Sequence, residues 1–319
     1  MSYGAVDVRL GKQIISWGRA DAVNPTDNLT PRDLTMLVAE DDDQRSGVPA
    51  GRLAVAVGGL TVTGLWLAAF QGSTLPFGTM LPGTRTNRPT QREAMRQGAL
   101  RIERAGERVD WSVSYFSGFD LSPDLALRST PAGDVLELTN NRLHVLGADA
   151  ATTLGRFGVR AEAAVITTGD GSGSNPEIKN STFFAVVGTD RTFGEYFNVN
   201  VQSIVRVVRG FTAPESEADP SRRAVALLLA GLSQQLRAVQ HGATIRVSNK
   251  WLHETLDAEV SGIFLASPGQ LLMRPRASYA FSDRWKLVAG TDRADGAAGT
   301  LFRSLRANSL AFAELRRGL

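Results

Sequence analysis

The chain alternates apolar and polar residues over many short segments, most clearly over residues 197–208, which read FNVNVQSIVRVV. Val201 and Val205 fall on one side of an extended chain here, and Asn200 and Gln202 fall on the other. Because successive side chains of an extended chain point to opposite faces, this period of two predicts a β-strand with one apolar and one polar face. Its length is that of a membrane-crossing strand, for which about nine to eleven residues are needed.

The same alternation recurs along the whole chain and predicts fourteen strands. They cover residues 6–17, 52–57, 60–70, 100–103, 110–115, 142–152, 159–165, 181–189, 197–208, 241–248, 255–265, 273–281, 285–292 and 309–317. A glycine pair at residues 58–59 predicts one of the hairpin turns. The Ala- and Leu-rich segment 224–236 favours a short helix by propensity.

Long and short connections alternate between these strands. The links after strands one, three, five, seven, nine and thirteen are long, those after the even-numbered strands are short, and residues 266–272 form an intermediate link. Outer-membrane barrels have short periplasmic turns and longer external loops. We therefore expect one domain over residues 1–319, a transmembrane antiparallel up-and-down β-barrel in the cell outer membrane, in which residues 18–51 and 209–240 form long loops.

Composition narrows the possibilities further. The 319 residues include no cysteine, which excludes disulfides and thiolate metal sites, and no window of eighteen consecutive apolar residues, which excludes a transmembrane helix. The 35 basic residues leave a net charge of only +3 and form no basic block, so nucleic acid is not an expected partner. The first residues, MSYGAVDVRLGKQ, contain no export leader, so we expect a mature or truncated form.

Residues 11–33, GKQIISWGRADAVNPTDNLTPRD, carry a family resemblance. The segment resembles a family of poorly characterised porin-like outer-membrane β-barrel proteins of Gram-negative bacteria, in which a strand ending in Gly-x-Gln-x-x-x-Trp-Gly leads into Asp-x-x-Asn-Pro-x-Asp. The matching positions here are Gly11, Gln13, Trp17, Gly18, Asp21, Asn24, Pro25 and Asp27. Later segments that match in style are VDWSVSYFSGFDLSPD, VVGTDRTFG, RPRASYAFSD and NSLAFAELR.

The resemblance implies outer-membrane lipid and the barrel-assembly machinery as partners. It also marks two departures. Members usually carry a signal peptide and further strands before the point where this chain begins, so Met1 resembles a late start. Members tend to end on an aromatic residue that the assembly machinery reads, whereas this chain ends Arg-Arg-Gly-Leu.

Charged and amide residues on the polar side of the strands are expected to point into the barrel. They are Arg9, Gln13, Arg101, Glu103, Arg160, Glu162, Arg206, Arg246, Asp257, Glu259, Arg274, Arg276 and Lys286. A lumen lined by both signs, with arginine in excess, favours polar or anionic solutes over cations. The alternative is that these charges pair across strands and only fill the interior.

The long loop after the first strand has its own polar residues, namely Arg19, Asp21, Asn24, Asp27, Arg32 and Asp33, and an acidic run at 40–43. One interpretation is an inward-folded constriction that filters solutes, or an external calcium site. The other is a solvated loop in which two X-Pro steps set turns, and for the acidic run this second interpretation is favoured.

Aromatic residues recur near strand ends, where membrane barrels carry aromatic girdles. They are Trp17, Phe70, Phe119, Phe157, Phe197, Trp251, Phe281 and Trp285. Catalysis has weak support, because the three histidines, at 144, 241 and 253, lie on separate segments and no Gly-x-Ser-x-Gly elbow is present.

The sequence therefore predicts a passive channel or uptake protein for small polar or anionic solutes, without enzymatic activity, cofactor or metal, and leaves its oligomeric state open. Two alternatives stay open: a soluble secreted all-β protein that binds or cleaves polysaccharide, and an outer-membrane barrel hydrolase that uses one of the histidines.

Overall fold

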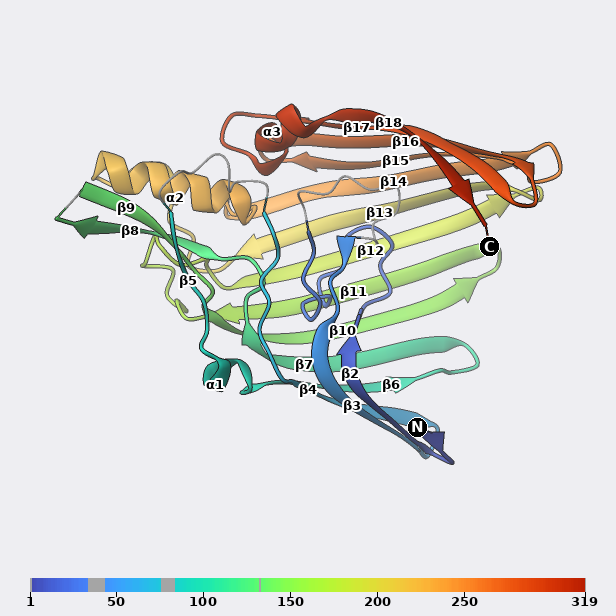
Figure 1. The fold of residues 1–319 in the computed structure, drawn as a ribbon, viewed down its shortest axis with the longest axis horizontal. Helices are drawn as coiled ribbons and strands as arrows, with labels where there is room; N and C mark the ends of the chain where they lie inside the picture. Colours follow the sequence, from blue (N-terminus) through green and yellow to red (C-terminus); the bar gives the residue numbers. More distant parts are fainter. Residues whose placement is uncertain (1, 34–43, 76–83, 132, 319) are drawn as a thin grey trace.

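One large antiparallel sheet makes up most of the protein (Figure 1). The computed structural model describes residues 2–33, 44–75, 84–131 and 133–318. Fifteen strands of this part pair in chain order, with β5, β8 and β9 set aside in a second sheet. The fifteen are β1 (Ser2–Tyr3), β2 (Val6–Gln13), β3 (Val48–Val57), β4 (Leu60–Leu67), β6 (Gln97–Arg104), β7 (Val109–Phe119), β10 (Arg142–Leu154), β11 (Phe157–Thr168), β12 (Thr182–Phe193), β13 (Phe197–Val208), β14 (Val239–Trp251), β15 (Leu256–Ala266), β16 (Gly269–Ser282), β17 (Trp285–Gly296) and β18 (Leu310–Arg317).

The predicted fold class, an all-β antiparallel sheet with strands in chain order, is confirmed. All fourteen predicted strands are present, and each pairs antiparallel with its neighbours in the sheet. The sheet curves around an interior, and its two edges are β1 with β2 at one end of the order and β18 at the other. No pairing between β18 and either edge strand occurs within the described residues.

In this sheet the apolar side chains point outward and the polar side chains point inward, the reverse of the arrangement in a soluble protein. Val201, Val260 and Leu146 point outward and are 41%, 43% and 55% exposed, whereas Gln202 and Glu162 point inward and are 1% and 2% exposed. No second sheet or helix layer covers the apolar face in the described part of the chain, so an apolar solvent must do so. An antiparallel barrel wall with a lipid-facing apolar band is an outer-membrane structure, and the protein resides in that membrane.

The short turns and the long loops gather at opposite ends of the strands (Figure 1). At the long-loop end, α2 (Pro220–Leu232) lies in the link after β13, and β5 (Arg85–Asn87), β9 (Gly133–Thr139) and β8 (Asp124–Thr130) form a small separate sheet. Short helical turns, α1 (Gln91–Ala94), α3 (Leu301–Ser304), η2 (Pro214–Ser216) and η3 (Leu305–Asn308), complete the connections. Among the described helices, none is both long and apolar enough to cross a membrane.

Several sequence-based boundaries are corrected. The first strand ends at Gln13 rather than residue 17, because the chain there turns inward. The long link after the fifth predicted strand, over residues 116–141, is expected to hold no strand but contains the β8–β9 hairpin. The intermediate link 266–272 is a tight turn at Ser267-Pro268, since β16 already begins at Gly269.

The aromatic girdle is present at the short-turn end only in part. Phe157, Phe197, Trp251, Phe281 and Trp285 are all exposed on strands that start or end at short turns. Trp17 and Phe119, in contrast, are buried at 6% and 7%, so their assignment to a girdle is wrong. Trp17 follows the inward turn of the chain after β2, and Phe119 is covered by the ring of Phe70.

Candidate functional site

The loop after β2 folds into the interior of the barrel. Figure 1 shows this segment, in blue, in front of the inner face of the sheet. Its residues Ile15, Trp17 and Leu29 pack in one apolar cluster with inward residues of β3, β4, β6, β7, β10 and β11. This burial of apolar side chains keeps the loop inside the barrel and closes most of the lumen on that side.

Glu162 on β11 is the wall residue that holds this loop. Its carboxylate accepts hydrogen bonds from the backbone N–H groups of Arg19 at 2.9 Å, Ala20 at 3.0 Å and Thr26 at 2.7 Å, and from the Thr26 hydroxyl at 2.8 Å. Four donors directed at one buried carboxylate both satisfy its charge and fix the backbone of residues 19–26. Gly18 can sit against the same carboxylate only because it has no Cβ, and its φ of +103° also favours glycine.

Asp21 reaches further across the interior. Its carboxylate accepts from Arg160 at 2.8 Å, Asn200 at 2.7 Å and Gln202 at 3.2 Å, three side chains that come from β11 and β13. Arg19 contacts the other side of the wall, where its Nε donates to Asp149 at 2.6 Å. The loop is therefore pinned across β10, β11 and β13.

The remaining predicted loop residues organise the loop itself. Asp27 accepts from Arg32 at 2.9 Å and from Arg45 at 2.7 Å, while the carbonyl of Asn24 accepts from the Asp27 backbone at 3.2 Å. The backbone of Asp33 donates to the Gln44 carbonyl at 2.8 Å. Because arginines surround Asp27, its carboxylate is not presented to a cation. Within the described ranges no group of three or more His, Asp or Glu side chains could hold a metal ion, and the acidic run at 40–43 lies outside those ranges.

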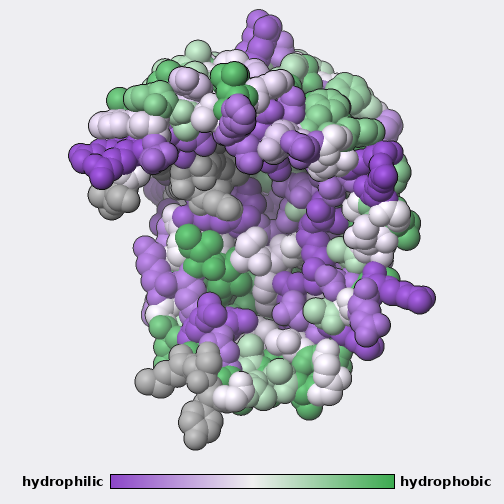
Figure 2. Space-filling model, turned by 90° about the vertical axis from the view of Figure 1, so that its right-hand side faces the viewer, coloured by the Kyte–Doolittle hydropathy of each residue, from purple (hydrophilic) through white to green (hydrophobic). Residues whose placement is uncertain are grey.

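On the opposite side the interior is hollow. A cavity of about 980 Å³ lies along the inner faces of β13 to β18. Its lining includes eight Lys or Arg side chains and five Asp or Glu side chains, so positive charge is in excess. Figure 2 views the short-turn end of the molecule and shows a hollow with hydrophilic side chains around it.

The cavity extends over the length of the strands. Lys286, the second residue of β17, and Arg316, its cross-strand partner, line it at the short-turn end. Asp120, Ser122 and Lys179 line it among the long loops. The hollow therefore reaches from one end of the sheet toward the other.

The thirteen predicted lumen residues have different surroundings. Seven of them line the cavity: Arg206, Arg246, Asp257, Glu259, Arg274, Arg276 and Lys286. Three of the others face the inserted loop or pair beside it: Arg101, whose guanidinium lies 5.9 Å above the Trp17 ring, Arg160 and Glu162. Glu103 pairs with Arg101 at 3.0 Å, and Gln13 donates to the Ala50 carbonyl at 2.9 Å. Arg9 lies on the edge strand β2 with a side chain that is 63% exposed and pairs with Asp7.

Many of the charges in the cavity wall are paired. Arg246 contacts Glu259 at 2.6 Å, and Arg274 and Arg276 share Asp292 at 2.9 Å and 3.9 Å. Arg206 differs, because its guanidinium donates to the carbonyls of Ser233 and Gln234 and stacks 4.4 Å above the Phe184 ring. Its positive charge is solvated by dipoles and a ring rather than by these carboxylates.

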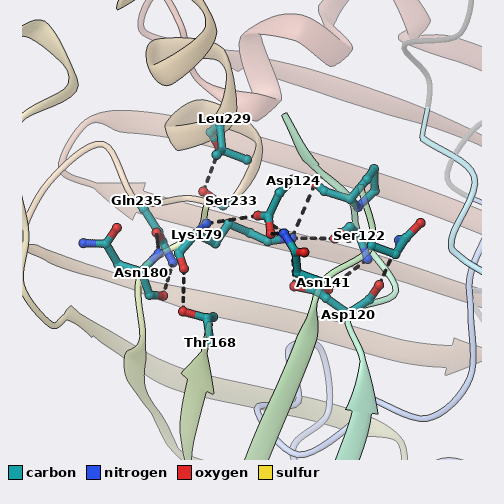
Figure 3. A network of polar contacts seen from close by, with 12 residues as sticks. Asp120, Ser122, Asp124, Asn141, Thr168, Lys179, Asn180, Leu229, Ser233 and Gln235 are labelled. Carbon is teal, nitrogen blue, oxygen red and sulfur yellow. Dashed lines mark hydrogen bonds and ion pairs between the residues drawn. The ribbon is translucent and has the colours of Figure 1, made fainter. Parts of the chain in front are cut away.

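Lys179 joins three long loops above the cavity (Figure 3). Its ammonium contacts Asp120 at 2.8 Å and Asp124 at 3.6 Å and donates to the carbonyl of Ser122, while Gln235, just after α2, exchanges hydrogen bonds with Asn180. Burial by itself lowers the pKa of Lys179, but the two carboxylates outweigh it and raise the pKa above the ordinary 10.5. The lysine therefore stays charged and clamps the loops together.

Sequence reasoning missed several of these residues. Asp149, Asp292 and Arg316 obey the same inward parity as the predicted set and could have been found by extending it along each strand. Asn200 and Gln202 lie on the polar face of the predicted strand 197–208, but no sequence pattern marks them as partners of Asp21. Lys179 lies in a Gly- and Ser-rich loop, where no local sequence pattern predicts its contacts.

No family model and no curated protein sequence matches the chain, whereas several solved structures resemble it. OmpT, an outer membrane protein of Vibrio cholerae, aligns over 91% of this chain and 66% of its own, at 11% identity and a TM-score of 0.41. OccK10 (OpdN) of Pseudomonas aeruginosa aligns over 99% and 80%, at 11% identity and a TM-score of 0.48. The outer membrane channel DcaP of Acinetobacter baumannii aligns over 99% and 96%, at 12% identity and a TM-score of 0.39.

Proposed function

We propose that the protein is a porin-like channel through which small polar solutes, anions above all, pass the outer membrane. The observation that carries the proposal is the cavity along β13 to β18, because its charged lining reaches from Lys286 at the short-turn end to Lys179 among the long loops. An excess of fixed positive charge in a low-dielectric channel concentrates anions and repels cations.

The inserted loop gives this channel its constriction. Asp21 on the loop lines the same cavity as Arg246 and Arg274 on the wall. Residues 14–33 fill the other half of the interior, so solutes have only the β13 to β18 side to pass through. We propose that the channel is passive and needs neither a cofactor nor a catalytic residue.

The alternatives fit the molecule less well. A soluble polysaccharide-binding protein does not expose large contiguous surfaces of Val, Leu and aromatic side chains, as this exterior does. A histidine hydrolase needs its groups together, whereas His144 lies on the outer face of β10, His241 on β14 and His253 in the turn after β14. His144 is held at 2.8 Å by the Tyr115 hydroxyl on the lipid-facing side.

The test is conductance across a planar bilayer under a salt gradient. Wild-type protein is expected to insert into the bilayer and to conduct ions, with a reversal potential whose sign indicates a preference for anions. Lys286→Glu reverses one charge at the exposed mouth of the cavity and is expected to reduce that selectivity, and Arg206→Glu is expected to do the same deeper inside. A pore with an unchanged reversal potential in both variants rejects the assigned path, and absence of any conductance rejects the channel.

A further inference from the structure

Five exposed arginines occur in two segments at the long-loop end of the sheet. The segment from β5 to the start of β6 contains Arg85, Arg88, Arg92 and Arg96, and β10 begins with Arg142, whose side chain contacts the Arg96 carbonyl. We refer to these five residues as the basic rim patch. None of the five forms an ion pair within the described part of the chain.

The position of the patch is fixed by contacts to the lipid-facing wall. The indole N–H of Trp66, an outward residue at the end of β4, donates to the Met95 carbonyl at 2.9 Å. The guanidinium of Arg142 donates to the Arg96 carbonyl at 3.1 Å and lies 5.0 Å above the Phe119 ring. These contacts hold the turn of α1 against the outside of the barrel wall rather than over its mouth.

An apolar surface adjoins the patch on the strands that carry it. Trp66, Met95, Leu100, Tyr115 and Leu146 are all between 45% and 55% exposed. Met95 directly follows α1, and the other four lie on the outer faces of β4, β6, β7 and β10. Tryptophan and tyrosine favour the level of the lipid headgroups, which places the arginines at that same level. Positive charge is thus concentrated where the acyl chains end and the headgroups begin.

The patch carries little negative charge of its own. Glu93 is the single carboxylate within residues 84–96, where it accepts from the Thr90 hydroxyl at 2.7 Å and the Thr90 backbone at 2.8 Å. These hydrogen bonds, and after them the charges of Arg96 and Arg142, lower the pKa of Glu93, so one carboxylate offsets part of the charge of the five arginines. Guanidinium groups bind phosphate through paired N–H donors, and clusters of them beside a membrane recognise anionic lipid.

We infer that the basic rim patch binds the phosphate groups of a phosphorylated lipid in the outer leaflet, whose acyl chains lie along the adjoining apolar wall. The lipid then becomes a fixed part of the barrel exterior next to the link that leads from β4 to β6. This inference depends on the membrane placement of the strands and not on the passage of solutes, so a failed conductance experiment leaves it standing.

The experiment titrates purified protein in neutral detergent with bisphosphorylated lipid A and follows bound lipid by native mass spectrometry. Wild type is expected to bind lipid A and to ignore the same lipid stripped of its phosphates. Arg96→Gln with Arg142→Gln removes two guanidinium groups and is expected to weaken binding at least about tenfold, given the strength of charge-assisted hydrogen bonds. Arg156→Gln, in the short turn between β10 and β11, is the matched control and is expected to bind as wild type does.

Folding of each variant is checked by its heat-dependent mobility on gels. If the double variant fails to fold, Arg88→Gln with Arg92→Gln replaces it, since these side chains extend from the exposed link and α1. Lipid binding that survives in the double variant that folds overturns the inference. So does an equal loss in Arg156→Gln, or a wild-type protein for which inorganic phosphate alone competes away all bound lipid A at equal concentration, which marks a free-anion site instead.

Discussion

Asp149 on β10 and Glu162 on β11 are direct cross-strand partners, and both carboxylates are buried on the inner face of the barrel. Two like charges in this arrangement destabilise a sheet unless other groups compensate them. Arg19 compensates Asp149, and the backbone of residues 19–26 compensates Glu162. The inserted loop therefore supplies the groups that stabilise these two buried carboxylates, and we expect the loop to stay in place in the folded barrel.

Replacing Glu162 by Gln is expected to loosen the loop. The amide loses the charge and offers only one oxygen to four donors, which costs about 2 kcal/mol for hydrogen bonds to a charged group. We expect a lower thermal stability, larger single-channel conductance and faster cleavage by trypsin after Arg19 or Arg32. Glu314→Gln on β18, whose carboxylate pairs with Arg316, is the control, and equal effects in the two variants contradict the anchoring role.

Replacing Asp21 by Asn is expected to make the channel more anion-selective. The substitution keeps the shape of the side chain but removes one of five negative charges in the cavity lining. The change is read from the reversal potential, at low salt where screening is weakest. A shift in the cation-selective direction is the opposite of what the proposed path requires.

Replacing Lys179 by Met is expected to open the long loops. It leaves the buried carboxylate of Asp124 beside that of Asp120 without their cation, and breaking a buried pair in this way costs about 3–5 kcal/mol. Limited proteolysis of residues 120–141 and 169–181 reports the opening. Arg128→Met removes the more exposed ion pair with Glu177 in the same loops and should cost less than about 1 kcal/mol.

The same clamp predicts a dependence on alkaline pH. Because the pKa of Lys179 is raised in the folded state, its stabilisation is complete below the ordinary value of 10.5 and is lost as pH rises through the folded value. The chain has no cysteine, so spin labels at Ser129→Cys and Ser174→Cys can follow the separation of the two loops. The distribution of distances between the two labels is expected to stay unchanged up to about pH 10 and to broaden only above about pH 10.5. Lys179→Met is expected to abolish this transition.

Neighbouring residues on one strand test the polarity of the wall. Val260 points outward at 43% exposed, and Ser261 lines the cavity. Val260→Arg is expected to destabilise the membrane-inserted protein by about 2–4 kcal/mol if the site lies near the bilayer midplane, whereas Ser261→Arg is expected to be tolerated. Urea unfolding from lipid vesicles measures both, and equal costs contradict a lipid-facing Val260.

The sequence by itself determined the wall of this protein. The period of two is a local property of an extended chain and does not depend on which strands pair, so it predicts that Val201 points outward and Gln202 inward. The alternation of long and short links predicts that the strands run up and down in chain order. It also marked Glu162, Arg206 and Arg274 as inward residues. It did not find the β8–β9 hairpin, since loop composition hides short strands.

Only the tertiary structure decided what the interior contains. Glu162 and Thr26, or Asp21 and Gln202, lie 136 and 181 residues apart in the chain, and no local pattern encodes which of them meet. Alternation fixes the face of a strand to which a side chain belongs, but the partner on that face depends on where a long loop folds. The half of the barrel that is filled by residues 14–33, and the half that stays hollow, follow from that long-range packing alone.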